Sequence, residues 1–172
     1  LCFCSPLATS RTMTFLAPTM INMIVQRPDS KGRAFPDLKC IMTGASPITD
    51  DTARGAHALF GDVLWQLYGQ TEAVPASLMS SKVWFGEYPG SNPMRATGKI
   101  LPWVEVEIWD TETQKKKAYG EEGEIAIRCD GQMSGFWDNP EATKERIVDG
   151  WVLTGDIGMV DKNGFLYLLD RK

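Results

Sequence analysis

The sequence has 172 residues, enough for one large domain or two small ones with a hydrophobic core. Its 43% hydrophobic and 23% charged residues are ordinary proportions for a globular protein. The net charge of −4 argues against nucleic acid or an anionic membrane as the main partner, because both attract basic surfaces. No apolar run approaches the roughly 20 residues of a membrane-spanning helix, so no integral membrane segment is expected.

Strand and helix patterns alternate along the first part of the chain. Residues 13–16 are a short apolar run that predicts a strand. Pro18 then opens a run with apolar residues at helical spacing, and Pro28 ends it. Residues 38–43 are mostly apolar, which is typical of a strand buried on both faces of a parallel sheet.

A second helix and a further strand complete a β-α-β unit. Thr49 is a suitable cap for a helix that Gly61 ends, and residues 63–68 form the next strand, which stops at a glycine. Parallel strands joined by a crossover helix place their carboxyl-end loops at the same edge of the sheet. We therefore expect residues 44–47 and 69–72 to be neighbours, at the edge where open α/β sheets bind ligands.

The later part of the chain has the pattern of antiparallel strands. Residues 103–109 alternate with period two and place Val104, Val106 and Ile108 on one face, and residues 124–128 alternate similarly. Asp161-Lys162-Asn163-Gly164 predicts a hairpin turn. One helix interrupts these strands, with Asn139 as its cap and Pro140 at its first position.

This change of pattern predicts two parts. The turn-forming segment Pro89-Gly90-Ser91-Asn92-Pro93 marks the boundary between them. Residues 1–95 would be part of an α/β subdomain, and residues 96–172 a mainly antiparallel β subdomain.

The cysteines predict reduced thiols rather than a metal site, because no histidine or second cysteine pair completes a zinc-binding set. Reduced thiols are typical of a cytoplasmic protein. The sequence also has no initiator methionine and stops directly after a strand-like run, so we expect a fragment of a longer protein. The cysteines are Cys2, Cys4, Cys40 and Cys129.

Two short segments carry residues suited to nucleotide chemistry. Thr71 and Glu72 follow a buried strand, and a threonine hydroxyl can donate to a phosphate while a carboxylate suits Mg²⁺. Asp156 follows an apolar run and Gly155, so we expect it in a loop after a strand, where its carboxylate could accept hydrogen bonds from the two hydroxyls of a ribose. Each segment taken alone is also compatible with an ordinary turn.

Tyr68-Gly69-Gln70-Thr71-Glu72-Ala73 resembles the YGxTE signature of the adenylate-forming enzymes, which include acyl-CoA synthetases, luciferases and peptide-synthetase adenylation domains. Further segments match that family in the same order, so the resemblance covers nearly the whole chain from about Thr14 onward. They are Gly44-Ala45-Ser46-Pro47, Thr97-Gly98-Lys99-Ile100-Leu101-Pro102, Gly123-Glu124-Ile125-Ala126-Ile127, Gly135-Phe136-Trp137, Thr154-Gly155-Asp156, and Gly164-Phe165 through Asp170-Arg171.

The resemblance implies a fold and a role for each matching residue. The fold would be the end of an α/β subdomain followed by a β-barrel-like subdomain. Tyr68 would stack on adenine, Thr71 would contact the α-phosphate, and Glu72 would hold Mg²⁺. Asp156 would bind the ribose hydroxyls with help from Arg171. The other implied nucleotide-binding residues are Gly44, Ala45, Ser46, Gln66 and Gly69.

The implied reaction is that of an ATP-dependent acyl-CoA synthetase. A small fatty or aryl carboxylic acid would attack the α-phosphorus of ATP, with Thr71 and Glu72 in the catalytic roles, and the acyl-adenylate would then form a thioester with coenzyme A. The family's Ser/Thr/Gly-rich phosphate loop and the domain with its catalytic lysine have no counterpart here, so the isolated chain is expected to be inactive. Two alternatives are a non-catalytic nucleotide-binding module and a plain α/β interaction domain.

Overall fold

The computed structural model describes residues 12–172, and the predictions made for Cys2 and Cys4 lie outside this range. The chain forms two compact units, one ending at Trp65 and the other running from Gln66 to Lys172. Within the described range, no helix is both long enough and apolar enough to cross a membrane.

The first unit contains a β-α-β arrangement. β1 and β2 pair in parallel, with Met13 opposite Cys40 and Phe15 opposite Met42, and α1 connects them. The strand–helix–strand pattern expected from the sequence is confirmed here. The elements of this unit are β1 (Met13–Phe15), α1 (Pro18–Val25), the 3-10 helix η1 (Pro28–Ser30), β2 (Cys40–Thr43) and α2 (Asp50–Phe60).

Local signals set the ends of α2. The Thr49 side chain accepts a hydrogen bond from the Thr52 backbone N–H at 3.3 Å, which satisfies one of the free donors of the first turn. Gly61 follows the last turn with a φ of 74°, a conformation that favours glycine. Ala53 and Ala56 are buried. The predicted cap, helix and terminating glycine are all confirmed.

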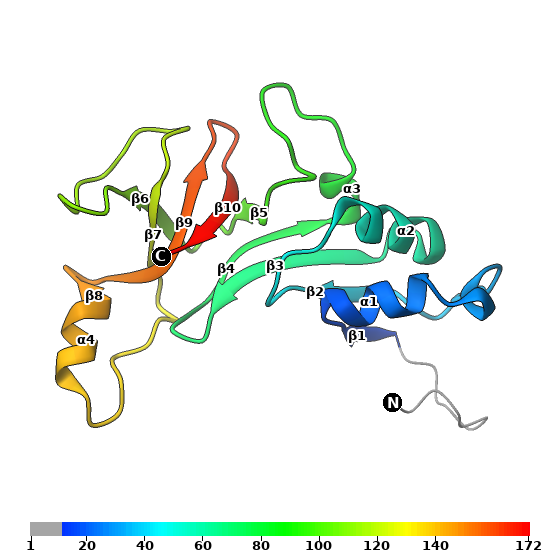
Figure 1. Ribbon diagram of the computed structural model, residues 1–172, viewed down its shortest axis with the longest axis horizontal. Helices are drawn as coiled ribbons and strands as arrows, with labels where there is room; N and C mark the ends of the chain where they lie inside the picture. The colour runs from blue at the N-terminus through cyan, green and yellow to red at the C-terminus, as the bar shows by residue number, and fades with distance from the viewer. Residues whose placement is uncertain (1–11) are drawn as a thin grey trace. The chain divides into compact units, whose positions relative to one another are not determined.

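The second unit is built on an antiparallel sheet with the strand order β4-β5-β10-β9-β7-β6 (Figure 1). No ladder among its residues joins β6 to β4, so the sheet is open and the barrel-like expectation holds only for its antiparallel strands, not for closure. The elements are β4 (Ala73–Ser80), α3 (Ser81–Trp84), β5 (Gly98–Ile100), β6 (Glu105–Trp109), β7 (Gly123–Arg128), α4 (Pro140–Arg146), β8 (Ile147–Val148), β9 (Trp151–Val160) and β10 (Phe165–Arg171).

Several features predicted for this part are confirmed. β9 and β10 pair antiparallel across the turn at residues 161–164. Asn139 caps α4 by accepting from the Ala142 N–H at 3.1 Å. Val104 and Ile108 are buried in the core of this unit, and Val106 packs against it.

β3 (Leu64–Gln70) differs from its prediction. The strand was expected over residues 63–68 with Gly69 as its end, but it continues to Gln70, and Thr71 and Glu72 form the two-residue turn that leads into β4. A Cβ atom at Gly69 would lie 3.2 Å from the Ala73 carbonyl oxygen and 3.3 Å from the Pro75 Cα. This glycine therefore permits a close approach to β4 rather than ending β3.

The contacts along the chain divide it at a different place from the predicted subdomain boundary. Ala76 of β4 lies in the same core as Ile125, Val152 and Leu166. β4 also pairs antiparallel with β5, which lies beyond residue 95. These contacts join residues 73–80 to the second unit, and the division at residues 95 and 96 stays a prediction about the subdomains of the parent fold.

Gly158 gives a direct test of this packing. A Cβ atom at this position would overlap the Tyr167 carbonyl oxygen and lie 2.7 Å from the Ile125 Cδ1. We expect Gly158→Ala to lower the free energy of unfolding by at least about 2 kcal/mol, because backbone on the paired strand cannot move aside cheaply. Urea unfolding followed by circular dichroism measures this change.

Gly131→Ala is the matched control for this experiment. Its new Cβ atom would lie 3.5 Å from the Val74 carbonyl oxygen, an ordinary contact. Equal effects of the two substitutions would contradict the arrangement of β9 between β7 and β10.

Candidate nucleotide-binding site

Thr154-Gly155-Asp156 lies within β9 and forms a bulge there. Glu124 pairs with Ile157 and Ala126 pairs with Leu153, so Ile125 alone faces the three residues 154–156. Asp156 was expected in a loop after a strand, and the structure corrects this, because the strand continues on both sides of it. Bulges re-aim side chains at sheet positions that a regular ladder could not use.

Asp156 is a buried carboxylate with three hydrogen-bond donors around it. It is 4% exposed. Its Oδ2 accepts from the Tyr68 hydroxyl and from the Gln70 Nε2, both at 2.7 Å. Its Oδ1 accepts from the Arg171 Nε at 3.0 Å. A buried carboxylate is stable only with such partners, so these side chains form one coupled group.

Tyr68 takes part in this group as a neutral donor. Burial of the ring raises the pKa of the Tyr68 hydroxyl above its ordinary value, and the nearby Asp156 carboxylate raises it further. The phenol therefore keeps its proton through the physiological range and donates it to Asp156. Tyr68 as a whole is only 9% exposed.

Gln70 is a member of the group that the sequence reasoning did not assign to the site. Besides its bond to Asp156, its Nε2 donates to the Thr154 carbonyl oxygen at 2.8 Å, so it joins β3 to the bulge. A periodic signal was available, because alternate residues of a strand share a face, and Gln70 stands two positions after Tyr68. The sequence assigns Thr154 no role beyond its motif, yet its hydroxyl donates to the Ile125 carbonyl oxygen at 2.8 Å.

Gln66 stands two positions before Tyr68 on β3. Its Oε1 atom is buried and has no hydrogen-bond partner in the described part of the chain. A buried acceptor without a donor is costly, and such atoms in native folds call for an explanation. The amide oxygen of Gln66 is therefore available to a donor group of a ligand.

Thr71 and Glu72 lie at the turn between β3 and β4. Thr71 is exposed and Glu72 is partly buried. The Glu72 carbonyl oxygen accepts from the Met133 N–H at 2.8 Å, which fixes the backbone of the turn. Residues 12–172 contain no group of three potential metal ligands, but Mg²⁺ commonly binds through one or two carboxylates plus substrate phosphates. The single carboxylate of Glu72 fits that mode of binding.

Gly44, Ala45 and Ser46 belong to the first unit, directly after β2. Gly44 is buried, while Ala45 and Ser46 are exposed. Ala45 has a φ of 68°, which is unusual for a residue with a side chain and marks a constrained loop. The other predicted site residues all lie in the second unit, and the adjacency of the two groups stays a prediction.

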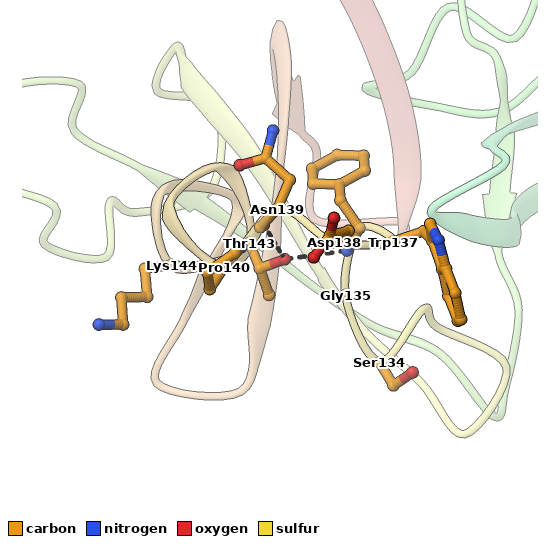
Figure 2. A pocket seen from close by; sticks show the side chains of 9 residues that line it. Ser134, Gly135, Trp137, Asp138, Asn139, Pro140, Thr143 and Lys144 are labelled. Carbon is orange, nitrogen blue, oxygen red and sulfur yellow. Dashed lines mark hydrogen bonds between the residues drawn. The ribbon is translucent and has the colours of Figure 1, made fainter.

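Two pockets lie in the described part of the chain, and neither is lined by predicted site residues. One, with a volume of about 580 Å³, lies beside α4 and is lined by residues 134–140, Thr143 and Lys144 (Figure 2). Trp137 at its rim is 98% exposed. The other, of about 470 Å³, lies in the first unit and includes Pro47, next to Ser46. The buried group around Asp156 is thus a polar cluster rather than a wall of either pocket.

Comparison with known proteins assigns the family. The family model described as "AMP-binding enzyme" matches residues 8–137. The chain belongs to this family. The expected membership of the adenylate-forming enzymes is confirmed.

The relatives agree with this assignment. The chain is 34% identical over 162 residues to 4-coumarate–CoA ligase 1 of Oryza sativa subsp. japonica, covering 93% of this chain and 28% of the relative. It is 30% identical over 156 residues to the long-chain-fatty-acid–CoA ligase of Bacillus subtilis, and this match covers 91% of this chain and 27% of the relative. The amide bond synthetase McbA from Marinactinospora thermotolerans has a similar structure, with a TM-score of 0.81, 31% identity, and coverage of 93% of this chain and 31% of that one.

These coverages place a limit on the assignment. The chain spans less than a third of the length of each of these relatives. The structural match confirms the mixed fold, with parallel strands first and antiparallel strands after them.

The contribution of the Tyr68–Asp156 hydrogen bond to the free energy of unfolding should depend on pH. We expect Tyr68→Phe to lower the free energy of unfolding by about 1–2 kcal/mol near pH 8, because Asp156 loses a buried donor. The raised pKa of Tyr68 means that its contribution is fully present below the unfolded-state pKa of about 10 and is lost as pH rises further. The difference between wild type and variant should therefore shrink above about pH 10.

Chemical denaturation at several pH values measures this difference. Tyr119→Phe is the control, because Tyr119 is 70% exposed. If the difference in the free energy of unfolding between wild type and Tyr68→Phe stays constant up to pH 11, the buried hydrogen bond is contradicted.

Proposed function

We propose that this chain is the AMP-binding part of an AMP-forming acyl-CoA ligase. The observation that carries the proposal is the buried Asp156 carboxylate with its donors Tyr68, Gln70 and Arg171, in a chain of the AMP-binding enzyme family. The parent protein would join a carboxylic acid to the adenylyl group of ATP with release of pyrophosphate, and would then pass the acyl group to a thiol with release of AMP.

Asp156 would bind the ribose. A carboxylate has about four lone-pair positions, and three of those of Asp156 are engaged in the structure. A ribose diol donating two hydrogen bonds would therefore replace at least one present donor. Arg171, whose side chain is 77% exposed, could turn towards the ribose at little cost while remaining near Asp156.

The base would be bound beside β3. The unpartnered Gln66 Oε1 suits the exocyclic amino group of adenine, which is a hydrogen-bond donor. The Tyr68 ring would have to leave its buried position beside Asp156 in order to stack on the base. Gly44, Ala45, Ser46 and Gly69 would contribute backbone around the nucleotide, as the family resemblance implies.

The phosphates would lie at the β3–β4 turn. The exposed Thr71 hydroxyl would donate to the α-phosphate, and the Glu72 carboxylate would hold Mg²⁺. When bound, Mg²⁺ would neutralise charge on the phosphate oxygens. A two-residue hairpin turn orients these adjacent side chains with little freedom, which suits a reaction that depends on positioning.

The proposed reaction has two steps. A carboxylate oxygen of the acid forms a bond to the α-phosphorus of ATP as the bond to pyrophosphate breaks, which gives an acyl-adenylate. The thiol of coenzyme A then attacks the acyl carbon and releases AMP. The names of the two CoA ligases support a fatty or aryl acid as the substrate and coenzyme A as the acceptor. The name of the structural neighbour, an amide bond synthetase, supports a different acceptor for the acyl group in that protein.

The isolated chain would bind nucleotide without turning it over. It spans less than a third of each relative, and the phosphate loop and catalytic lysine that the family resemblance calls for were not found in the sequence. A cytoplasmic location for the parent would suit the free cysteines Cys40 and Cys129. A longer protein that includes both missing parts should release pyrophosphate with a fatty or aryl acid.

Glu72→Ala tests the metal role within this chain. We expect calorimetry to give binding of AMP at or below about 1 mM for wild type. The variant should bind MgATP about tenfold more weakly, because the metal loses its protein ligand, while AMP binding measured with EDTA should stay unchanged.

Glu87→Ala is the control, since Glu87 is an exposed carboxylate of the same unit outside the site. No binding of AMP or MgATP to wild type would favour a plain interaction domain. Equal loss of AMP and MgATP affinity in Glu72→Ala would point to a structural effect of the substitution instead of metal binding.

A further inference from the structure

A second buried carboxylate lies beside the bulge and has no part in the proposed chemistry. Glu124 of β7 is 6% exposed. Its Oε1 accepts from the Gly155 backbone N–H at 3.0 Å, and its Oε2 accepts from the Lys172 Nζ at 3.1 Å. One side chain therefore joins β7, the bulge of β9 and the residue that follows β10.

These contacts hold Gly155 from two sides. Its N–H donates to Glu124, and its carbonyl oxygen accepts from the Lys172 backbone N–H at 2.8 Å. Gly155 immediately precedes Asp156, and Lys172 immediately follows Arg171. The partners of Glu124 are thus the chain neighbours of the two residues assigned to ribose.

The bulge explains why this support is needed. Where three residues face one, the regular ladder cannot satisfy every backbone group, so other partners must. The Asp156 N–H is satisfied by the Thr154 hydroxyl at 3.1 Å, and the Gly155 N–H by Glu124. Gly155 has a φ of 71°, so its geometry would strain any other residue.

The charge of Glu124 matters as well as its oxygens. A buried carboxylate without partners is strongly unfavourable, and Lys172 and the Gly155 N–H together compensate it. Lys172 is half exposed, so it would not be held against β9 by burial alone. Removing the charge of Glu124 should release the end of β10 while leaving an oxygen for Gly155.

We propose that Glu124 is a positioning residue of the ribose site. Its carboxylate fixes the Gly155 peptide and the Lys172 end of the chain, and by doing so it holds Asp156 and Arg171 opposite each other. The inference rests on the proposed function for the ligand, but the geometric part of it concerns this chain alone.

The first experiment uses Glu124→Gln, with Glu105→Gln as the matched control. Glu105 lies on the neighbouring strand β6 and forms an exposed ion pair with Arg128 of β7, so its substitution removes a carboxylate without touching the bulge. The affinities of AMP and of 2′,3′-dideoxy-AMP are measured by calorimetry. The dideoxy nucleotide lacks the 2′ and 3′ hydroxyls, so its affinity measures every contact of the nucleotide except those to these hydroxyls.

We expect Glu124→Gln to weaken AMP binding about tenfold, the loss of roughly one charged hydrogen bond to the ribose. The affinity for dideoxy-AMP should stay the same, and Glu105→Gln should change neither. Equal weakening of both nucleotides, or no change for AMP, would overturn the proposal.

A second measurement works without nucleotide. The Gln70 side-chain amide bridges the Thr154 carbonyl oxygen and Asp156, so its proton exchange in NMR reports whether the bulge is in place. Glu124→Gln should speed this exchange, and Glu105→Gln should not. If wild type binds no AMP, the proposed function fails, and unchanged Gln70 exchange would separately reject the positioning role.

Lys172→Gln covers the case in which Glu124→Gln does not fold. This substitution keeps the Glu124 bond to Gly155 and removes only the cation. It should lower the AMP affinity and speed the exchange of the Gln70 side-chain amide protons, each by less than Glu124→Gln does. If Lys172→Gln has the same AMP affinity and the same Gln70 amide exchange as wild type, the ion pair has no role in holding the site.

Discussion

The structure of the candidate site depends on the burial of one carboxylate. Asp156 is 4% exposed and needs donors, and its donors come from two different strands. Tyr68 and Gln70 reach it from β3, while Arg171 reaches it from β10. Removing any of them leaves charge or lone pairs unsatisfied in a poorly solvated place. The carboxylate thereby makes the positions of these strands interdependent.

Sequence reasoning succeeded where the physical cause is local. The cap of α2 at Thr49, the helix start at Pro140 and the turn at residues 161–164 depend on residues within a few positions of each other. The same holds for the alternation of β6, which buries Val104 and Ile108. The family resemblance was equally local, since short motifs carried it, and the match over residues 8–137 confirmed it.

The remaining features depend on pairing between distant strands. The bulge at residues 154–156 exists because of how β9 pairs with β7, and nothing within the motif shows whether the strand ends there. Gly69 was interpreted as the end of a strand, while its physical reason is the nearness of β4. Glu124 belongs to a recognisable motif, but its hydrogen bonds to Gly155 and Lys172 span 31 and 48 positions of the sequence. Such contacts follow from register, which a single sequence leaves open.

Register also decides which charges meet at the end of β10. Leu168 pairs with Gly158, but Asp170 pairs with Ile157, so Leu169 is an extra residue on that strand. If Leu169 instead paired with Ile157 in a regular antiparallel ladder, Asp170 would stand opposite Asp156, and two like charges would face each other. With it, Arg171 stands opposite Asp156. Successive residues along an extended backbone point in opposite directions, so Lys172 can pair with Glu124 while Arg171 pairs with Asp156. The bulge at the half-exposed Leu169 therefore sets the pairing of two cations with two buried carboxylates.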